Sequence, residues 1–163
     1  MKNNELSNIP TEMDFLSAEH DLFASPFYLI AHADFHYHED LDRAAARYGL
    51  DRTAYRLLTT LYRKSPMNIK ELAHNALIKR STATRALIRL KEAGMVTQSN
   101  DETDSRIVNV DLTELGRDTD AKILLLGDRQ LARAIEGISE ERLRELVAVL
   151  RQMVVNLTKL PIE

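Results

Sequence analysis

The sequence predicts a mainly helical protein with one small β-hairpin, which is an α+β fold. The first observation is that apolar residues recur at spacings of three and four along most of the chain, as on the buried stripe of an amphipathic helix. The second is that this spacing changes to two between residues 95 and 112, which is typical of strands. The third is the lack of any stretch of about 18 or more apolar residues, so we expect no membrane-spanning segment.

Composition limits the classes of protein that the chain can represent. Its 163 residues are about the length of one domain, and 44% hydrophobic and 29% charged residues are ordinary for a soluble globular protein. The absence of cysteine excludes a disulfide scaffold, a thiolate zinc site, a cysteine nucleophile and a switch based on thiol oxidation. The first residues lack the apolar run of a signal peptide, so we expect a cytoplasmic protein.

The N-terminal part of the chain predicts an arm followed by a long helix. Residues 1–24 are polar and mixed, so we expect an arm that is partly ordered at best. Ser25 and Pro26 are typical of an N-cap and a first helical turn, and apolar residues then recur at helical spacing until Gly49. This pattern predicts a first helix within residues 25–49.

Two short helices are predicted next. Asp51 can cap a second helix, which the pair Ser65-Pro66 ends. The buried stripe of this helix is Ala54, Leu57, Leu58 and Leu61. Asn68, three residues before Glu71, resembles a capping box and opens a brief third helix.

A fourth helix and a hairpin follow. The helix is predicted to start near Lys79–Ser81 and to end at Gly94. Its buried residues are expected to be Ala83, Ala86, Leu87 and Leu90. Residues 95–99 and 106–112 read as two strands, and the polar residues 100–105 join them as a turn.

Two further helices complete the predicted fold. Thr113 can cap a long helix through about Glu136, which Gly137 ends. Ser139 opens a last helix, whose apolar stripe continues until Pro161. This stripe is Leu143, Leu146, Val147, Leu150, Val154 and Leu157.

Basic charge is concentrated in the fourth helix, although the whole chain carries a net charge of −3. Residues 79–91 contain five Lys or Arg residues and no Asp or Glu. Because the apolar stripe faces a core, polar and basic side chains are left on the other surface. Such a helix can enter the DNA major groove, where Arg pairs with guanine edges and Ser or Thr bonds bases or phosphates. Its N-terminus also favours a phosphate. A solvated charged surface is the alternative interpretation.

The order of the elements favours the DNA-binding interpretation. A short capped helix, a tight connection, a basic helix and a hairpin directly behind it make a helix-turn-helix with a wing. The candidate DNA-contacting residues of the basic helix are Lys79, Arg80, Ser81, Thr82, Thr84, Arg85 and Arg89. A winged helix used only for protein contacts is the other interpretation, since this fold need not bind DNA.

The same stretch resembles the DNA-binding core of the MarR family of transcriptional regulators, and the long flanking helices resemble the family's dimerisation region. The resemblance covers most of residues 26–160 and is carried by the segment NIKELAHNALIKRSTATRALIRLKEAGMVTQSNDETDSRIVNVDLTELGR. The family's S-T-x-T-R run is present as Ser81–Arg85, its D-x-R wing signature as Asp104–Arg106 and its L-T-x-x-G-R ending as Leu112–Arg117.

The resemblance implies a mainly α fold with a small β-hairpin wing and a helical dimerisation region. It places the winged helix-turn-helix in residues 50–113 and the dimerisation region in residues 25–49 and 114–160. It implies a sequence-specific, ligand-responsive regulator, usually a repressor, that binds double-stranded operator DNA as a homodimer.

The wing signature has a physical rationale. A carboxylate beside the turn can fix a neighbouring guanidinium so that it points into the narrow, electronegative minor groove. We assign the groove contact to Arg106 and the orienting role to Asp104; an ordinary hairpin ion pair is the alternative. The chain has Gln98 where the family commonly has Arg at the end of the first wing strand, so a phosphate contact there is expected to be weaker or missing.

The apolar surface of the last two predicted helices supports a dimer. The run Ile123–Leu126 and the stripe of the last helix exceed what one small winged domain covers. A monomeric helical bundle is the alternative. In a two-fold dimer, two recognition helices would meet successive major grooves about 34 Å apart, so the operator is expected to be a pseudo-palindrome.

The resemblance further implies a pocket between the dimerisation helices and the winged unit that binds small aromatic, often anionic, effectors. Aromatic walls with a few cationic or hydroxyl groups suit such ligands. The candidate pocket residues are Phe35, His36, Tyr37, Arg52, Tyr55 and Arg56. Plain core packing is the alternative for the aromatic residues.

A metal site is the less favoured interpretation of the first helix. His32 and His36 have the i, i+4 spacing that can chelate zinc. A third ligand on that face is missing, because the helix register places Asp34 and His38 elsewhere. We expect neither a metal nor a cofactor, and a metal-responsive regulator remains the alternative. The sequence has no Gly-rich phosphate loop, nucleophile motif or recognisable pair of carboxylates, so we do not expect an enzyme.

Overall fold

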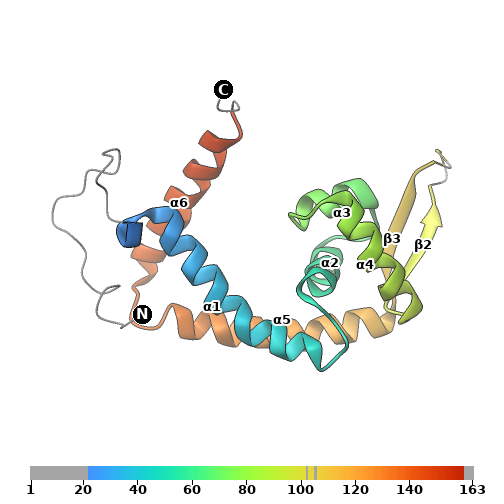
Figure 1. Cartoon of the computed structure of the whole chain (residues 1–163), viewed down its shortest axis with the longest axis horizontal. Helices are drawn as coiled ribbons and strands as arrows, with labels where there is room; N and C mark the ends of the chain where they lie inside the picture. The colour runs from blue at the N-terminus through green and yellow to red at the C-terminus, as the bar shows by residue number, and fades with distance from the viewer. Residues whose placement is uncertain (1–21, 102, 105, 160–163) are drawn as a thin grey trace. The chain divides into compact units, whose positions relative to one another are not determined.

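The structure, a computed structural model, describes residues 22–101, 103–104 and 106–159 (Figure 1). Apart from a short 3-10 helix, η1 (Leu22–Ala24), the predicted N-terminal arm lies outside the described residues. The chain divides into two compact units, Met1–Gly127 and Asp128–Glu163, which we call unit 1 and unit 2. The expected mainly helical fold with a small sheet is confirmed.

Six helices carry most of the described residues. They are α1 (Pro26–Ala46), α2 (Arg52–Arg63), α3 (Ile69–Asn75), α4 (Arg80–Glu92), α5 (Glu114–Ala134) and α6 (Glu140–Leu157). Among the described residues, no helix is long and apolar enough to cross a membrane.

The helix starts follow the predicted capping residues. Asp51 Oδ1 accepts a hydrogen bond from the Ala54 amide at 2.8 Å, and Asn68 Oδ1 accepts one from the Glu71 amide at 2.9 Å. Each carboxylate or amide oxygen satisfies one of the amides that a helix leaves unpaired at its start. Ser25 occupies the N-cap position of α1 but its side chain makes no capping bond.

The sheet has three antiparallel strands in the order β1-β3-β2, where the sequence predicted a two-stranded hairpin. The strands are β1 (Met67–Asn68), β2 (Val96–Asn100) and β3 (Val108–Leu112). Met67 pairs with Val110, and Val96 pairs with Leu112. The missed strand β1 has only two residues, which is too short to show a period. β3 begins at Val108 rather than at 106, because the Ile107 amide and carbonyl are both bonded within the turn.

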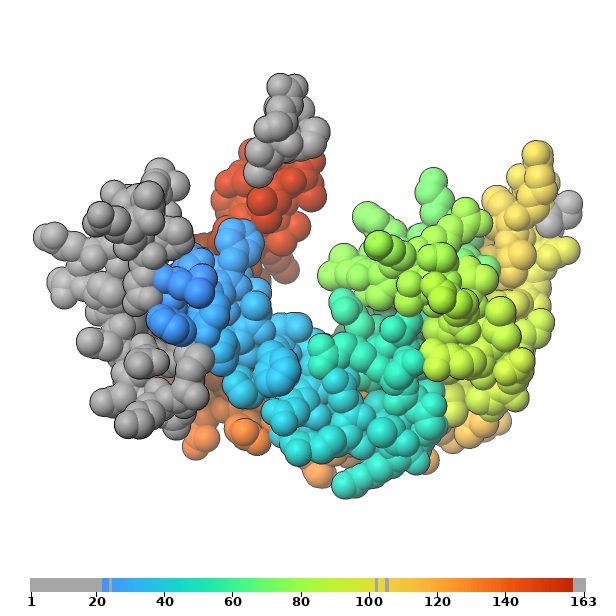
Figure 2. All heavy atoms as spheres, viewed as in Figure 1, coloured from blue at the N-terminus to red at the C-terminus, as the bar shows by residue number. Residues whose placement is uncertain are grey.

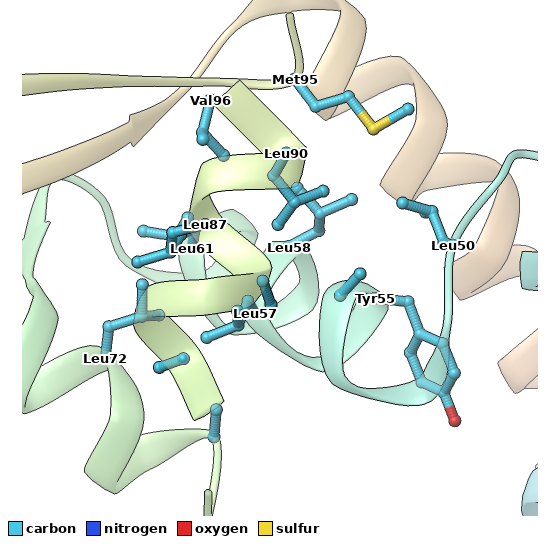
Figure 3. Close-up of a cluster of buried hydrophobic side chains, with 14 of the residues drawn as sticks. Leu50, Tyr55, Leu57, Leu58, Leu61, Leu72, Leu87, Leu90, Met95 and Val96 are labelled. Carbon is cyan, nitrogen blue, oxygen red and sulfur yellow. The ribbon is translucent and has the colours of Figure 1, made fainter. Parts of the chain in front are cut away.

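The core of unit 1 joins α2, α3 and α4 to the sheet (Figure 3). Figure 3 shows Leu87 and Leu90 of α4 facing the leucines of α2 and Leu72 of α3. The α2 members are Leu57, Leu58 and Leu61, and all six of these leucines are buried. Burial of a leucine side chain stabilises the fold by roughly 1.5–3 kcal/mol. The predicted buried stripe of α4 is confirmed, and it fixes which side of α4 faces outward.

The start of α5 packs directly on the chain segment that precedes β2. Thr113 Oγ1 accepts from the Gly116 amide at 3.0 Å and donates to the Gly94 carbonyl at 2.7 Å. A Cβ atom on Gly116 would lie 2.1 Å from the Met95 carbonyl oxygen. Only glycine therefore permits this approach of helix and backbone.

We expect Gly116→Ala to lower the free energy of unfolding by about 1–3 kcal/mol, because backbone has to shift to admit the methyl group. Gly127→Ala is the matched control in the same helix, since its added Cβ would meet only the Tyr37 hydroxyl, at 3.4 Å. There alanine's higher helix propensity should leave stability unchanged or raise it by up to about 1 kcal/mol. Urea unfolding of both variants measures the difference; equal effects would contradict the close-approach argument.

A buried carboxyl group connects α5 to α2. Asp120 is fully buried, and its Oδ1 accepts a hydrogen bond from Thr59 Oγ1 at 2.7 Å. Its Oδ2 has no hydrogen-bond partner among the described residues. Burial raises the pKa of Asp120 to about 6, although the Thr59 hydroxyl and the charge of Arg63 act in the opposite direction. The folded protein therefore keeps this carboxyl protonated up to a higher pH than an exposed aspartate would be.

We expect stability to fall as the pH rises from about 4 to about 6, because the folded state keeps the Asp120 proton while the unfolded chain, with an Asp pKa of about 3.9, loses it. Asp120→Asn removes this titration. Its unfolding free energy relative to the wild type should therefore increase by on the order of 2 kcal/mol between about pH 4 and pH 7. Urea unfolding across this range measures the difference. Asp118→Asn, an exposed carboxylate on the same helix, should show no such trend.

Unit 2 contains the end of α5 and the whole of α6. Ser139 Oγ accepts from the Arg142 amide at 3.4 Å, which places the N-cap of α6 at the predicted residue. No residue of α6 is buried. Its large exposed apolar residues are Leu146, Val147, Val149, Val154, Val155 and Leu157. The predicted end of the stripe at Pro161 lies outside the described residues.

Candidate nucleic-acid interface

The outward face of α4 presents four residues at the spacing i, i+3, i+4 and i+7. They are Ser81, Thr84, Arg85 and Ile88, and all are exposed. This spacing forms one stripe along a helix. The buried stripe of α4 lies on the opposite side, against α2, α3 and the sheet. In Figure 2, α4 (yellow-green) forms part of the surface of unit 1 turned to the viewer.

The polar groups of this face are partly engaged with the helix itself. Thr84 Oγ1 donates to the Arg80 carbonyl at 3.0 Å, so its hydroxyl is left as an acceptor. Arg85 Nε donates to the Ser81 carbonyl at 3.4 Å. The two terminal nitrogens of Arg85 have no partner among the described residues, so a bidentate contact with an acceptor pair remains available. Lys79 and Arg80 are exposed at the start of α4, whereas Thr82 is half-buried.

Arg89 is held by an ion pair that the sequence did not indicate. Its Nη2 lies 2.7 Å from Asp51 Oδ2, and its side chain is 61% exposed. Asp51 therefore caps α2 with one oxygen and binds α4 with the other. Burial alone would raise the pKa of Asp51, but the hydrogen bonds from Ala54 and Arg89 outweigh it and hold that pKa below its usual value. Arg89 thus joins α4 to the start of α2.

The turn of the wing is organised by two carboxylates. Asp104 Oδ1 accepts from the Arg106 amide at 3.0 Å and from Arg106 Nε at 3.2 Å. The Arg106 side chain is 91% exposed, so the ion pair orients a guanidinium that stays in solvent. Asp101, which the sequence did not single out, accepts from the Thr103 hydroxyl at 2.6 Å and from Asn109 Nδ2 at 3.0 Å. The Thr103 and Asn109 bonds hold the pKa of Asp101 well below its usual value.

An ion pair between Asp111 and Arg117 joins the wing to α5. Ser65 Oγ donates to Asp111 Oδ1 at 2.6 Å, and Arg117 Nη2 donates to the same oxygen at 3.2 Å. Asp111 lies on β3 and Arg117 on the first turns of α5. This contact gives Arg117 of the L-T-x-x-G-R motif a positioning role for the sheet. Gln98 is half-buried on β2, opposite Val110.

A cavity of about 230 Å³ lies among α1, α2, α3 and α5 within unit 1. Three of the candidate pocket residues line it: Tyr37, Tyr55 and Arg56. His38 and Thr59 also line it, although the sequence did not indicate them. The structure does not bring the other three candidates to this cavity. Phe35 and His36 are exposed, His36 beside Glu39, and Arg52 makes a bidentate ion pair with Asp42.

Tyr55 combines a buried ring with an unsatisfied polar group. Its ring belongs to the core cluster, and Figure 3 shows the hydroxyl pointing away from the leucines. The hydroxyl oxygen has no hydrogen-bond partner among the described residues. Burial, together with the charge of Asp42, raises the pKa of Tyr55, so the hydroxyl stays protonated and can donate to a ligand.

The histidines of α1 do not converge with other ligands. The His32 and His36 rings lie with centroids 5.3 Å apart, and His38 Nδ1 is 3.1 Å from Asp34 Oδ1. Within the described residues, no group of three or more His, Cys, Asp or Glu side chains could hold a metal ion.

Comparison with known sequences finds a family model and related proteins that match the chain. Residues 50–108 match the sequence model of the MarR family. The chain is 27% identical over 135 residues to the HTH-type transcriptional repressor IacR of Pseudomonas putida, covering 83% of this chain and 81% of that protein. It is 30% identical over 105 residues to the uncharacterised HTH-type transcriptional regulator YdgJ of Bacillus subtilis, covering 64% of each.

Solved structures share the fold. A MarR family transcriptional regulator from Silicibacter pomeroyi superposes with a TM-score of 0.80 and 27% identity, over 90% of this chain and 99% of that one. The protein in the S. aureus MepR–DNA complex superposes with a TM-score of 0.73 and 18% identity, over 82% and 98% of the two chains, which shows a shared fold alone.

The fold, the motifs and the relatives all point to the same assignment. Both named sequence relatives are described as a transcriptional regulator or repressor rather than as an enzyme. The family match covers α2, α3, α4 and β2 and reaches the first residue of β3. The winged helix-turn-helix region of the chain, residues 50–108, therefore matches the MarR family of transcriptional regulators, and the chain is similar to members of that family in sequence and in fold.

Proposed function

We propose that the chain is a sequence-specific regulator that binds double-stranded DNA as a homodimer and is released by a small aromatic or anionic ligand. The observation that carries the proposal is the outward face of α4, where basic and hydroxyl side chains are exposed directly opposite a fully buried stripe. A rigid helix with this chemistry fits the major groove. The repressor described for P. putida supports repression as the mode of action.

Each proposed contact uses a different property of the site. Arg85 has terminal nitrogens suited to a guanine edge, and the Thr84 oxygen can accept from an adenine or cytosine amine. Lys79 and Arg80 lie at the start of α4, where a phosphate is favoured. Ser81 and Thr82 complete this end of the face. Arg89 adds its charge at the edge of the face while it remains paired with Asp51.

The wing supplies the second proposed contact. The exposed guanidinium of Arg106, oriented by Asp104, suits a narrow and electronegative minor groove. In this proposal residues 50–113 form the DNA-binding region. A second copy of the chain would supply the second recognition helix, so that one dimer meets two successive grooves.

The proposed dimer is supported by apolar surface that the described part of the chain leaves uncovered. Every residue of α6 is at least partly exposed, including six large apolar side chains. In unit 1, α1 exposes Phe27, Leu29, Ile30 and Phe35. Large exposed apolar side chains on helices are typical of an oligomer interface. We therefore propose residues 25–49 and 114–160 as the dimerisation region.

The proposed ligand site is the cavity of unit 1. Its volume of about 230 Å³ is below the usual range of about 300–1,000 Å³ for drug-sized ligands, which favours a compound with one or two rings. Tyr37 and Tyr55 supply aromatic walls, Arg56 supplies a cation, and the unsatisfied Tyr55 hydroxyl supplies a donor. An aromatic acid matches these groups.

We expect the chain to bind duplexes selected from a random-sequence pool, and the recovered site to contain an inverted repeat. If about six to ten phosphates are contacted, affinity should fall roughly 10³- to 10⁵-fold between 50 and 200 mM salt. Fluorescence anisotropy with the selected duplex measures this dependence. Arg85→Ala should cost about 1–3 kcal/mol and relax base preference at one position, whereas Arg47→Ala, an exposed cation at the end of α1, should do neither. Failure to select any duplex would favour a protein-interaction module instead.

We expect phenolic and aromatic acids to raise the thermal unfolding midpoint of the protein and to displace it from the selected duplex. Tyr55→Phe should weaken ligand binding by about 0.5–1.5 kcal/mol, because it removes one hydrogen bond and keeps the ring. Tyr62→Phe is the matched control, since Tyr62 lies on the same helix and does not line the cavity. Thermal shift and duplex displacement are measured together. The proposed ligand class is wrong if none of these acids produces either effect.

A further inference from the structure

Ile88 is an apolar residue in the middle of a polar surface. Its side chain is 53% exposed, although the other large apolar residues of α4, Leu87 and Leu90, are buried. It lies one turn after Thr84 and Arg85 and two turns after Ser81, on the same outward stripe. Exposure of a large apolar side chain here contributes nothing to the core of unit 1, so the position is open to another role.

We propose that Ile88 reads the C5-methyl group of a thymine in the major groove. The inference rests on the proposed function, in which α4 enters that groove. The spacing i, i+3, i+4 and i+7 of the outward stripe is the one at which the homeodomain recognition helix places its four base-reading residues. Ile88 therefore stands within the set of positions from which a helix reaches base edges.

The chemistry of the side chain selects the group that it can recognise. Isoleucine has no hydrogen-bond donor or acceptor, so it cannot bind a phosphate or a polar base edge. The thymine methyl is the apolar group that base pairs present in the major groove. A β-branched side chain in a helix has one strongly preferred rotamer, so Ile88 presents a fixed surface rather than a mobile one.

The neighbours of Ile88 set where this thymine should lie. Residues 85 and 88 are separated by about 4.5 Å along a helix axis, which is close to the 3.4 Å rise of one base pair. The thymine is therefore expected within one or two base pairs of the base contacted by Arg85. Ile88 thereby discriminates thymine from cytosine, because cytosine carries no methyl group at C5.

The experiment replaces thymine by deoxyuridine, which lacks only the C5-methyl group. A duplex is first selected from a random-sequence pool with the wild-type chain, and each thymine is then replaced in turn, at equivalent positions of the two half-sites. Wild-type affinity should fall about fourfold per half-site at one thymine, the fold-change that corresponds to burial of one methyl group. Ile88→Ala should bind the unmodified duplex more weakly and lose this sensitivity to deoxyuridine, while Ile88→Val should keep most of it.

Leu115→Ala is the matched control, because Leu115 is 52% exposed on α5 and lies outside the α4 stripe. It should retain the wild-type sensitivity to deoxyuridine. Insensitivity of the wild type to every replacement, or full sensitivity of Ile88→Ala, overturns the role of Ile88 while leaving DNA binding intact. Failure of the wild type to select any duplex refutes the proposed function itself and the thymine contact with it.

Discussion

The contact between the leucines of α4 and those of α2 and α3 determines the direction of the outward face of α4, the surface proposed to contact DNA. Leu87 and Leu90 are enclosed by the α2 leucines and Leu72, so α4 cannot rotate about its axis without opening the core. Close-packed interiors resist such movement, because even one methylene group out of place is costly. The direction in which Arg85 points is therefore a consequence of where two leucines on the other side of the helix are buried.

Polar contacts at the edges of this core fix the remaining parts of unit 1. Asp51 holds the start of α2 and the side chain of Arg89 at once, and Asp111 holds both the loop after α2 and Arg117 of α5. These pairs are partly exposed, so each contributes little to the free energy of folding. Their effect is geometric: Asp51 and Arg89 join the start of α2 to α4, and Asp111 joins the loop after α2 to the start of α5.

Much of the fold was predictable because it depends on local patterns. The caps at Asp51, Asn68 and Thr113 and the buried stripe of α4 follow from residues within a few positions of one another. Strand β1 was not predictable, because a two-residue strand has no period. It is defined by its pairing with Val110, which lies far along the chain. The partner of Arg89 was missed for the same reason, since 38 positions separate it from Asp51.

The residues of the candidate ligand pocket were likewise only partly predictable, because long-range contacts decide which of them face the cavity. On α1, Tyr37 reaches the cavity while Phe35 and His36 do not, because one residue changes the direction of a side chain by about 100° and only contacts with other helices decide which direction faces the cavity. Ile88 was not predictable from the polar pattern of α4, because it carries no charge and no hydrogen-bonding group; its position on the outward stripe is what indicates it.

Tyr55 connects α2 both to the hydrophobic core of unit 1 and to the cavity. Its ring packs with the leucines that contact α4, the same residue lines the cavity, and the N-cap of the same helix, Asp51, forms an ion pair with Arg89. A ligand in the cavity would contact this tyrosine on a helix of twelve residues, whose N-cap is joined to α4. In the proposed function, α2 is therefore the helix through which a ligand in the cavity would change the position of α4.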